Sequence, residues 1–367
     1  MVNRMILSNI LHRPVRTLVS ILAVAIEVGL VLLVVGMTNG LLNEAAKRVE
    51  GVGADLMVQP PNASFLFGLG SAPVPVKLAD RLAEVPHVLA VAPVLFQSNV
   101  TGGLNVVWGI DMASWNRVSL GFVYHAGGPL AGPDDLLVDD WYAKANDVKV
   151  GRNLNLLSHD FRVAGIVEHG KGSRLFIPLA TAEDLSGAHE KASIFFVKCT
   201  DPGYTDDVLG AVRQLLPKYQ ILTVKEYMSL MTSNNLPALN AFVTAMIAVA
   251  VAIGFLVIFL SMYTTITERT REIGILKSLG SSKAYIIDII LREAGLLSLI
   301  GIVAGYVGSL IAGRIILESF PTLAIDPPTA RWAARAALLA LGGSLLGAFY
   351  PALHAAQLDP VDALAYE

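Results

Sequence analysis

The side chains that most often carry chemistry are few in this sequence, and they form no familiar catalytic pattern. The seven histidines are scattered, and HExxH, HxxxH and GxSxG motifs are absent. The closest grouping is His159, Asp160, Glu168 and His169, which precedes a glycine-rich stretch at Gly170–Gly172. Because such a stretch is typical of a turn, we interpret the grouping as a solvent-exposed hairpin.

An acidic run and a single cysteine are the remaining candidates. Asp134, Asp135, Asp139 and Asp140 lack the alternating ligand spacing and central glycine of a calcium loop, so they predict turn and helix-cap chemistry. Cys199 has no partner for an intramolecular disulfide and no metal-type spacing, which indicates a small buried residue. We therefore expect no catalytic residue, metal or cofactor in this chain.

The composition points to a membrane protein. Of 367 residues, 54% are hydrophobic and only 16% are charged, which is too apolar for an ordinary soluble chain. The net charge of −3 argues against nucleic-acid binding, which usually needs a basic stripe.

Four stretches are long and apolar enough to cross a bilayer as helices. The first is longer than the apolar core of a signal peptide and lacks a cleavage site beyond it, so we interpret it as a retained anchor. Glycines dilute the fourth, but glycine is common in membrane helices. The predicted spans are Leu18–Met37, Ala241–Tyr263, Gly295–Leu317 and Ala333–Leu353.

Basic residues set the expected orientation, because they accumulate on the cytoplasmic side of a membrane. They cluster before the first span and between the second and third, which places both chain termini in the cytoplasm. The residues concerned are Arg4, Arg13, Arg16, Arg269, Arg271, Lys277, Lys283 and Arg292.

About 200 residues then lie outside, between the first two spans, and their mixed pattern of Val/Ile-rich strands and short helices predicts one α+β domain. A helical stalk over Ser229–Ala241 is expected to lead into the second span. We divide the chain into residues 1–40 (cytoplasmic start and first span), 41–236 (extracytoplasmic domain), 237–266 (stalk and second span), 267–293 (cytoplasmic elbow), 294–317 (third span), 318–332 (outer loop), 333–353 (fourth span) and 354–367 (cytoplasmic tail).

Two features stand out from this plan. A loop within residues 62–76 is unexpectedly apolar, through Phe65, Leu66, Phe67 and Leu69. It either folds onto its own domain or contacts a cargo, a partner or the outer leaflet. Glu27 places a carboxyl group near the middle of the first span, where a charge is costly. We favour a structural hydrogen bond inside the bundle, to a residue such as Tyr263, Thr264 or Tyr306; a role in cargo entry or coupling is the alternative.

The elbow, residues 267–293, carries more charge than a link between antiparallel helices needs. Basic residues would anchor it to the membrane, but that function does not require Glu268, Glu272 or the Leu279-Gly280 pair. A serine at 281 or 282 is expected to cap the next helix. The compact charged shape is suited to docking another protein. Because the sequence contains no GxxxxGK[ST], any ATP must be bound by a different chain.

Here the sequence resembles a known family. ERTREIGILKSLGSSKAYI (268–286) strongly resembles the cytoplasmic elbow of ABC-transporter permeases of the MacB/LolC/FtsX superfamily. LSNILHRPVRTLVSILAVAIEVGLVLLV (7–34), GVGADLMVQ (51–59), LLVDDWYAKANDVKVGRNLNLLSHDFRVAGIVE (136–168) and AFYPALHAAQLDPVDALAYE (348–367) are similar to other parts of it. The chain departs from the family at Arg152, where Asp is usual after Val-Gly, and at Glu27 in the first span.

The resemblance implies a stand-alone, DevC- or LolC-like permease without a fused ATPase domain, and not an enzyme in itself. Two separate ATPase subunits would bind ATP and Mg, and a second permease copy or paralogue would complete the complex. Motion would pass through the elbow to the outer domain and move an amphiphilic cargo (lipoprotein, lipid, peptide or hydrophobic drug) at the outer face of the bacterial inner membrane. The ATPase-facing joint would comprise Glu268, Arg269, Arg271, Glu272, Ile273, Gly274, Lys277 and Gly280.

Two other functions compete with transport. An FtsX-like signalling permease would use the same motion to activate a cell-wall hydrolase, but such chains usually have a smaller outer domain. A membrane-anchored enzyme or adhesin would need neither the charged elbow nor an ATPase. A membrane-fusion protein is a further candidate partner, and its gene beside that of the ATPase would favour export.

Overall fold

A computed structural model describes residues 14–61, 63, 72–99, 105–232 and 235–359. The chain divides into two compact units. One, the helical unit, comprises residues 1–40, 237–319 and 325–367; the other, the α/β unit, comprises residues 41–236 and 320–324. The apolar loop residues Phe65, Leu66, Phe67 and Leu69 lie outside the described residues.

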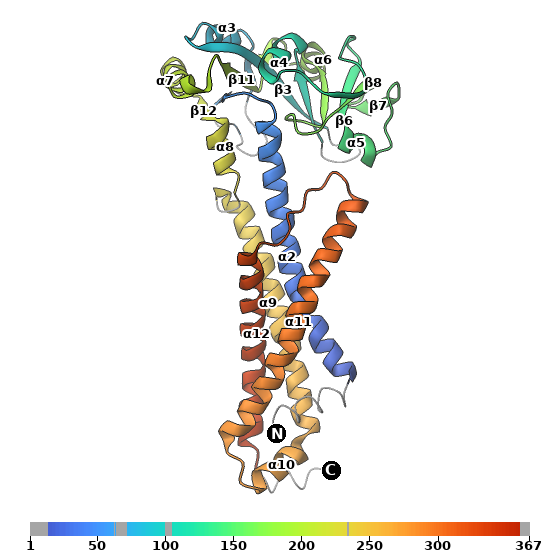
Figure 1. Ribbon diagram of the computed structural model, residues 1–367, viewed down its shortest axis with the longest axis vertical. Helices are drawn as coiled ribbons and strands as arrows, with labels where there is room; N and C mark the ends of the chain where they lie inside the picture. The colour runs from blue at the N-terminus through green and yellow to red at the C-terminus, as the bar shows by residue number, and fades with distance from the viewer. Residues whose placement is uncertain (1–13, 62, 64–71, 100–104, 233–234, 360–367) are drawn as a thin grey trace. The chain divides into compact units, whose positions relative to one another are not determined.

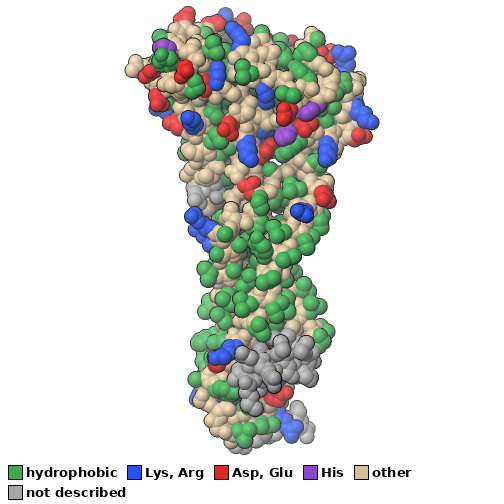
Figure 2. Space-filling view, in the orientation of Figure 1, with side chains coloured by type: hydrophobic (Ala, Val, Ile, Leu, Met, Phe, Trp, Pro, Cys, Tyr) green, Lys and Arg blue, Asp and Glu red, His purple; other side chains and the backbone are tan. Residues whose placement is uncertain are grey.

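The helical unit contains four helices that are long and apolar enough to span a membrane, which confirms the four predicted spans. They are α2 (Pro14–Glu50), α9 (Pro237–Glu268), α11 (Lys283–Ser319) and α12 (Ala330–Gln357), with the short α10 (Thr270–Ser278) between α9 and α11 (Figure 1). Hydrophobic side chains cover much of their visible surface, whereas charged side chains are concentrated on the α/β unit (Figure 2). The last ten residues of α2, 41–50, belong to the α/β unit.

Small residues bring these helices into close contact. A β-carbon at Gly347 of α12 would lie 2.8 Å from the carbonyl oxygen of Phe255 in α9. Between α12 and α11, the hydroxyl groups of Ser344 and Ser298 share a buried hydrogen bond of 2.8 Å. Since lipid offers little hydrophobic force between apolar helices, such close packing and hydrogen bonding must hold them together. Of the glycines that dilute the fourth span, Gly347 is therefore one that lets it pack closely, whereas a β-carbon at Gly342 would meet nothing within 4 Å.

The same principle joins α2 to α11 and α9. Gly301 and Gly305 lie one turn apart on α11, and a β-carbon at either would lie within 3 Å of α2 atoms, at Val24 and Ala25 respectively. Ser20 of α2 and Ser261 of α9 share a hydrogen bond of 2.6 Å. The spacing of the two glycines is the small-xxx-small pattern of membrane helix contacts.

Glu27 is buried between α2 and α9, with 5% of its surface exposed. Its side chain lies against Gly254, where a β-carbon would stand only 1.9 Å from the Glu27 Oε2 atom. Within the described residues, Oε1 has no hydrogen-bond partner. The carboxyl group thus occupies a space that a glycine leaves open, and no hydrogen bond from it to Tyr263, Thr264 or Tyr306 is found there.

We predict that Gly254→Ala destabilises the chain by about 1–3 kcal/mol, because the new methyl group must displace Glu27 in a packed interface. Gly308→Ala is the matched control, since a β-carbon there meets nothing within 4 Å. The double variant Glu27→Ala/Gly254→Ala should recover most of the loss. Thermal unfolding in detergent measures all four proteins; equal losses in Gly254→Ala and Gly308→Ala would contradict the prediction.

The α/β unit is built on a ten-stranded sheet of order β12-β1-β11-β3-β4-β9-β6-β8-β5, with β7 paired to β8 (Figure 1). Its strands are β1 (Leu56–Gln59), β3 (Val88–Asn99), β4 (Asn105–Ile110), β5 (Tyr124–Gly127), β6 (Asp135–Asp139), β7 (Asn153–Leu156), β8 (His159–Val167), β9 (Leu175–Pro178), β11 (Ile194–Cys199) and β12 (Gln220–Thr223). The helices are α3 (Leu78–Ala83), α4 (Met112–Ser119), α5 (Asp140–Ala145), α6 (Leu179–Ser186), α7 (Thr205–Leu215) and α8 (Val224–Leu230). A two-stranded sheet pairs β2 (Val74–Pro75) with β10 (Lys191–Ala192).

Most neighbouring strands are antiparallel, while β4/β9 and β6/β8 are parallel. The first and last strands of the domain, β1 and β12, are direct neighbours with Leu56 opposite Thr223. The two ends of the inserted domain therefore meet at one edge of its sheet.

Alternating side chains bury both faces of the central strands. On β11, Phe195 packs with α3 and α7, while the next residue, Phe196, contacts Trp108 and Trp115 on the opposite face. On β9, Leu175 and Ile177 pack in the core cluster that includes residues of α5 and α6, while Phe176 joins the aromatic group. Successive residues of a strand point to opposite faces of the sheet, so each of these short apolar runs contributes side chains to the hydrophobic core on both faces.

The acidic run combines the predicted turn and cap roles with a strand that was not predicted. Asp135 accepts hydrogen bonds from the backbone N–H groups of Ala131 and Gly132, and Asp139 caps α5 through the Tyr142 N–H at 2.6 Å. All five residues of β6, from Asp135 to Asp139, are buried.

The histidine grouping is dispersed. His159 contacts Asp134 at 2.8 Å, and His169 contacts Asp140 at 3.0 Å, so each has its own acidic neighbour. The positive φ angles of Gly170 and Gly172, +97° and +82°, confirm a turn, but the predicted hairpin is wrong there, because β6 lies between the flanking strands β8 and β9. The stalk predicted over Ser229–Ala241 is helical only from Pro237, where α9 begins, because Met231 and Thr232 are not helical.

Asp139 makes stability depend on pH. Burial raises the pKa of Asp139 to about 6, from an ordinary value of 3.8, against the opposing attraction of Arg174. The folded chain therefore holds this proton more tightly than the unfolded chain, and the resulting stability is lost as the pH rises through about 6.

Lowering the pH from about 7.5 to about 5.5 should stabilise the wild-type chain by about 1 kcal/mol more than Asp139→Asn, which keeps the helix cap. Thermal unfolding at the two pH values gives this difference. Asp135→Asn is the control: burial opposes ionisation there too, but the N–H groups of Gly132 and Ala131 and the Arg162 guanidinium lower the pKa of Asp135. A wild-type shift no larger than that of Asp139→Asn would refute the assignment.

Candidate functional site

The elbow is a helix–turn–helix reversal between two membrane-spanning helices. The chain leaves α9 at Glu268, forms α10, and turns at Gly280, whose φ of +91° favours glycine. Ser282 then accepts a hydrogen bond from the Tyr285 N–H at 3.2 Å, which confirms the predicted serine cap of α11.

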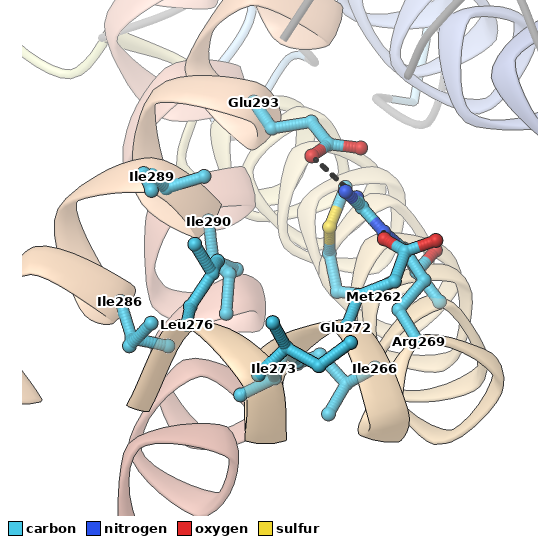
Figure 3. Close-up of a pocket in the computed structure, with 12 residues that line it drawn as sticks. Met262, Ile266, Arg269, Glu272, Ile273, Leu276, Ile286, Ile289, Ile290 and Glu293 are labelled. Carbon is cyan, nitrogen blue, oxygen red and sulfur yellow. Dashed lines mark hydrogen bonds and ion pairs between the residues drawn. The ribbon is translucent and has the colours of Figure 1, made fainter. Parts of the chain in front are cut away.

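A pocket of about 310 Å³ lies inside this reversal (Figure 3). Its wall is largely apolar and comes from all three helices, while its polar residues come from the junction of α9 with α10 and from α11. The lining residues are Met262, Thr265, Ile266, Arg269, Glu272, Ile273, Ile275, Leu276, Ile286, Ile289, Ile290 and Glu293.

Arg269 joins the three helices at the polar side of the pocket. Its Nε donates to Glu272 of α10 at 2.9 Å, and its Nη1 donates to Glu293 of α11 at 3.4 Å (Figure 3). Glu293 and Arg269 are largely buried, so their attraction is screened less than that of a surface pair. The ion pairs fix the angle at which α10 leaves α9.

Two further contacts brace the elbow. Arg16 of α2 contacts Glu268 and donates to the Thr265 hydroxyl at 3.2 Å, which ties the end of α9 to the first helix. Lys277 donates from its amine to the carbonyl oxygens of Ala356, at 3.0 Å, and Leu358. Carbonyl groups at a helix C-terminus lack intrahelical partners, so Lys277 stabilises the end of α12 while holding α10 against it.

One face of α10 remains exposed. Arg271, Glu272, Ile275, Ser278 and Leu279 recur at helical spacing along it. Leu279 is 80% exposed and Ile275 46%, although both are apolar. The braced elbow thus presents a small mixed surface of charges and apolar groups.

The predicted joint residues therefore separate into three groups. Arg271, Glu272 and Gly280 are exposed, whereas Ile273 and Gly274 are buried. The remaining three, Glu268, Arg269 and Lys277, contact other parts of this chain. Their meeting with another protein stays a prediction.

Sequence reasoning did not assign the exposed Ile275 and Leu279 to the joint, nor the bracing roles of Arg16 and Glu293. Helical spacing from Arg271 would have identified the first two. Among the described residues, no group of three or more His, Cys, Asp or Glu side chains is placed to hold a metal ion.

Comparison with known protein families covers almost the whole chain. The family model of the MacB-like periplasmic core domain matches residues 17–215, just over half of the chain. That of the FtsX-like permease C-terminal region matches residues 244–360, which include the elbow.

Individual relatives are distant but extensive. The macrolide export ATP-binding/permease protein MacB of Mannheimia succiniciproducens is 25% identical over 99% of this chain and 60% of its own length. The pyoverdine export ATP-binding/permease protein PvdT of Pseudomonas putida is 24% identical over 96% of this chain and 57% of its own. This chain thus spans about 60% of the length of these relatives.

Among solved structures, the periplasmic region of MacB from Actinobacillus actinomycetemcomitans aligns with 48% of this chain and 92% of its own, at 18% identity and a TM-score of 0.39. That similarity is too low to carry an argument, and the family models decide the assignment. Together they show that this chain belongs to the MacB/FtsX-type superfamily of ABC transporter permeases.

Proposed function

We propose that this chain is the permease subunit of an ABC transporter in a bacterial inner membrane, driven by a separate ATPase. Two ATPase subunits would bind ATP and Mg, and would act on a pair of permease chains, either two copies or two paralogues. Both chain termini would lie in the cytoplasm, and the α/β unit would lie outside the membrane.

The observation that carries this proposal is the exposed face of α10 on its braced elbow. A partner that pushes on this face meets a helix held by Arg269 to α9 and α11, and by Lys277 to α12. Force applied there is therefore distributed to three membrane-spanning helices. A loose, solvated loop with the same charges would absorb it.

The proposed cargo is amphiphilic: a lipoprotein, a lipid, a peptide or a hydrophobic drug. The helical unit has few polar groups from which to build a hydrophilic path: Ser298 and Ser344 are buried and hydrogen-bonded to each other, and the buried Glu27 is packed against Gly254. Cargo movement at the outer face fits this better than passage through the bundle. The size of the α/β unit favours export over FtsX-like signalling.

We predict that Leu279→Asp, alone or with Arg271→Glu, abolishes recovery of the ATPase with the purified permease. A charge replaces an exposed apolar side chain at the C-terminal end of this face, and loss of a central apolar contact of an interface costs about 2 kcal/mol or more, roughly thirtyfold in affinity. Co-purification from native membranes measures it.

Leu120→Asp is the matched control, because Leu120 is also a highly exposed leucine but belongs to the α/β unit. It should leave ATPase recovery unchanged. Failure of the wild-type chain to recover any P-loop ATPase would overturn the proposed function.

Lys277 should behave differently from Arg271. Lys277→Met leaves the carbonyl oxygens of Ala356 and Leu358 without their donor, so we expect a loss of about 1–2 kcal/mol in stability and weaker stimulation of the ATPase, with binding retained. Lys277→Arg should restore both, and the exposed Lys283→Met is the control. Unchanged thermal unfolding together with lost ATPase binding would instead make Lys277 a direct contact.

A further inference from the structure

Arg174, just before β9, contacts three segments that are far apart in the sequence. Its Nη2 donates to the carbonyl oxygen of Thr322 at 2.8 Å, in the connection between α11 and α12. Its Nη1 lies 3.4 Å from the Asp139 carboxylate at the start of α5, and Nη2 lies 3.9 Å from Glu44 of α2. All of these residues belong to the α/β unit.

The turn before Arg174 is also fastened to the end of α2. The Gly172 N–H donates to the carbonyl oxygen of Arg48 at 2.8 Å. A β-carbon at Gly51 would stand 1.9 Å from the carbonyl oxygen of Gly170, so the two backbones touch directly. A displacement of the last turns of α2 must therefore move this turn, and Arg174 with it.

The charges around Arg174 are balanced but loosely paired. Two arginines, Arg48 and Arg174, face two carboxylates, Glu44 and Asp139. The Arg48–Glu44 and Arg174–Glu44 separations of 3.7 and 3.9 Å exceed hydrogen-bond length. Among the described residues, Glu44 Oε1 and Arg48 Nε have no hydrogen-bond partner although both are buried. A buried polar group without a hydrogen-bond partner destabilises the fold. A small displacement that gave Glu44 and Arg48 such partners would therefore meet little energetic resistance.

We propose that Arg174 is a positioning residue that links the C-terminal end of α2 to the 320–324 segment, so that displacement of one repositions the other. Glu44 supplies the contact on α2, Thr322 supplies the contact on the segment, and Asp139 fixes the guanidinium between them. The link itself is a property of the resting chain; only the assignment of the displacement to an ATPase rests on the proposed function.

Hydrogen exchange of the full chain in detergent, without nucleotide, tests the link. The reporter is the 320–324 segment, in which the Leu323 N–H donates to the Phe320 carbonyl at 3.0 Å. Arg174→Met should speed its exchange by about tenfold, the effect of losing a hydrogen bond from a charged donor. Glu44→Gln, a change on α2, should speed it as well, and the double variant should be no faster than Arg174→Met alone.

Three results would overturn the link: an unchanged segment in Glu44→Gln, multiplicative effects in the double variant, or the same acceleration in Arg162→Met. Arg162 is the matched control because it pairs with Asp135 at the other end of β6, at 2.9 Å, but is 63% exposed. Arg174→Lys keeps the charge without the span of the guanidinium, so full rescue by lysine would also refute a bridging role.

A second arm adds the ATPase and a non-hydrolysable ATP analogue to the complex. In the wild type, exchange should change at residues 44–51 and 320–324 together; in Arg174→Met the change should be confined to 44–51. A nucleotide response of both segments in Arg174→Met would overturn the link. No response of either segment in the wild type would refute the proposed function, while the resting comparison would still decide the link.

Discussion

Polar groups inside a membrane-spanning unit must find their partners within the protein, because hydrocarbon offers none. Two serine pairs follow this constraint, one between α11 and α12 and one between α2 and α9, whereas Glu27 Oε1 is buried without a hydrogen-bond partner among the described residues. In the elbow it is burial in the protein that removes water: Arg269 contacts carboxylates on both α10 and α11, and Lys277 donates to carbonyl groups at the end of α12. Because the partners come from different helices, satisfying them also fixes the helices relative to one another.

This gives the charges of the elbow two different tasks. Glu268, Arg269 and Lys277 contact α2, α11 and α12 respectively, or residues at their ends, while Arg271 belongs to the exposed face. Without the contacts of Glu268, Arg269 and Lys277, the exposed face that carries Arg271 would have no fixed orientation. The charge density that looked excessive for a short link between helices is largely explained by the contacts that hold the link in place.

The sequence predicted the four spans and the inserted α+β domain, because hydropathy and strand patterns are local properties. It could not predict that Arg269 contacts other helices while Arg271 is exposed, because the side of α10 that faces the other helices is decided by tertiary packing. It also missed β6, because its two terminal aspartates resemble turn residues, and their burial depends on backbone N–H groups and arginines elsewhere in the chain. The helix predicted from Ser229 was interrupted for a similar reason: the mixed apolar and polar residues after Ser229 allow a helix but do not require one.

The pairing of β1 with β12 has a consequence for how the protein is made. Nearly the whole insertion lies between these strands, so the sheet edge that they form cannot close until the last of it has been synthesised and moved across the membrane. Long-range pairing of this kind is slow compared with local helix formation. During that interval the edge of β1 that later pairs with β12 is open, and chaperones or a partner chain would then have most opportunity to bind it.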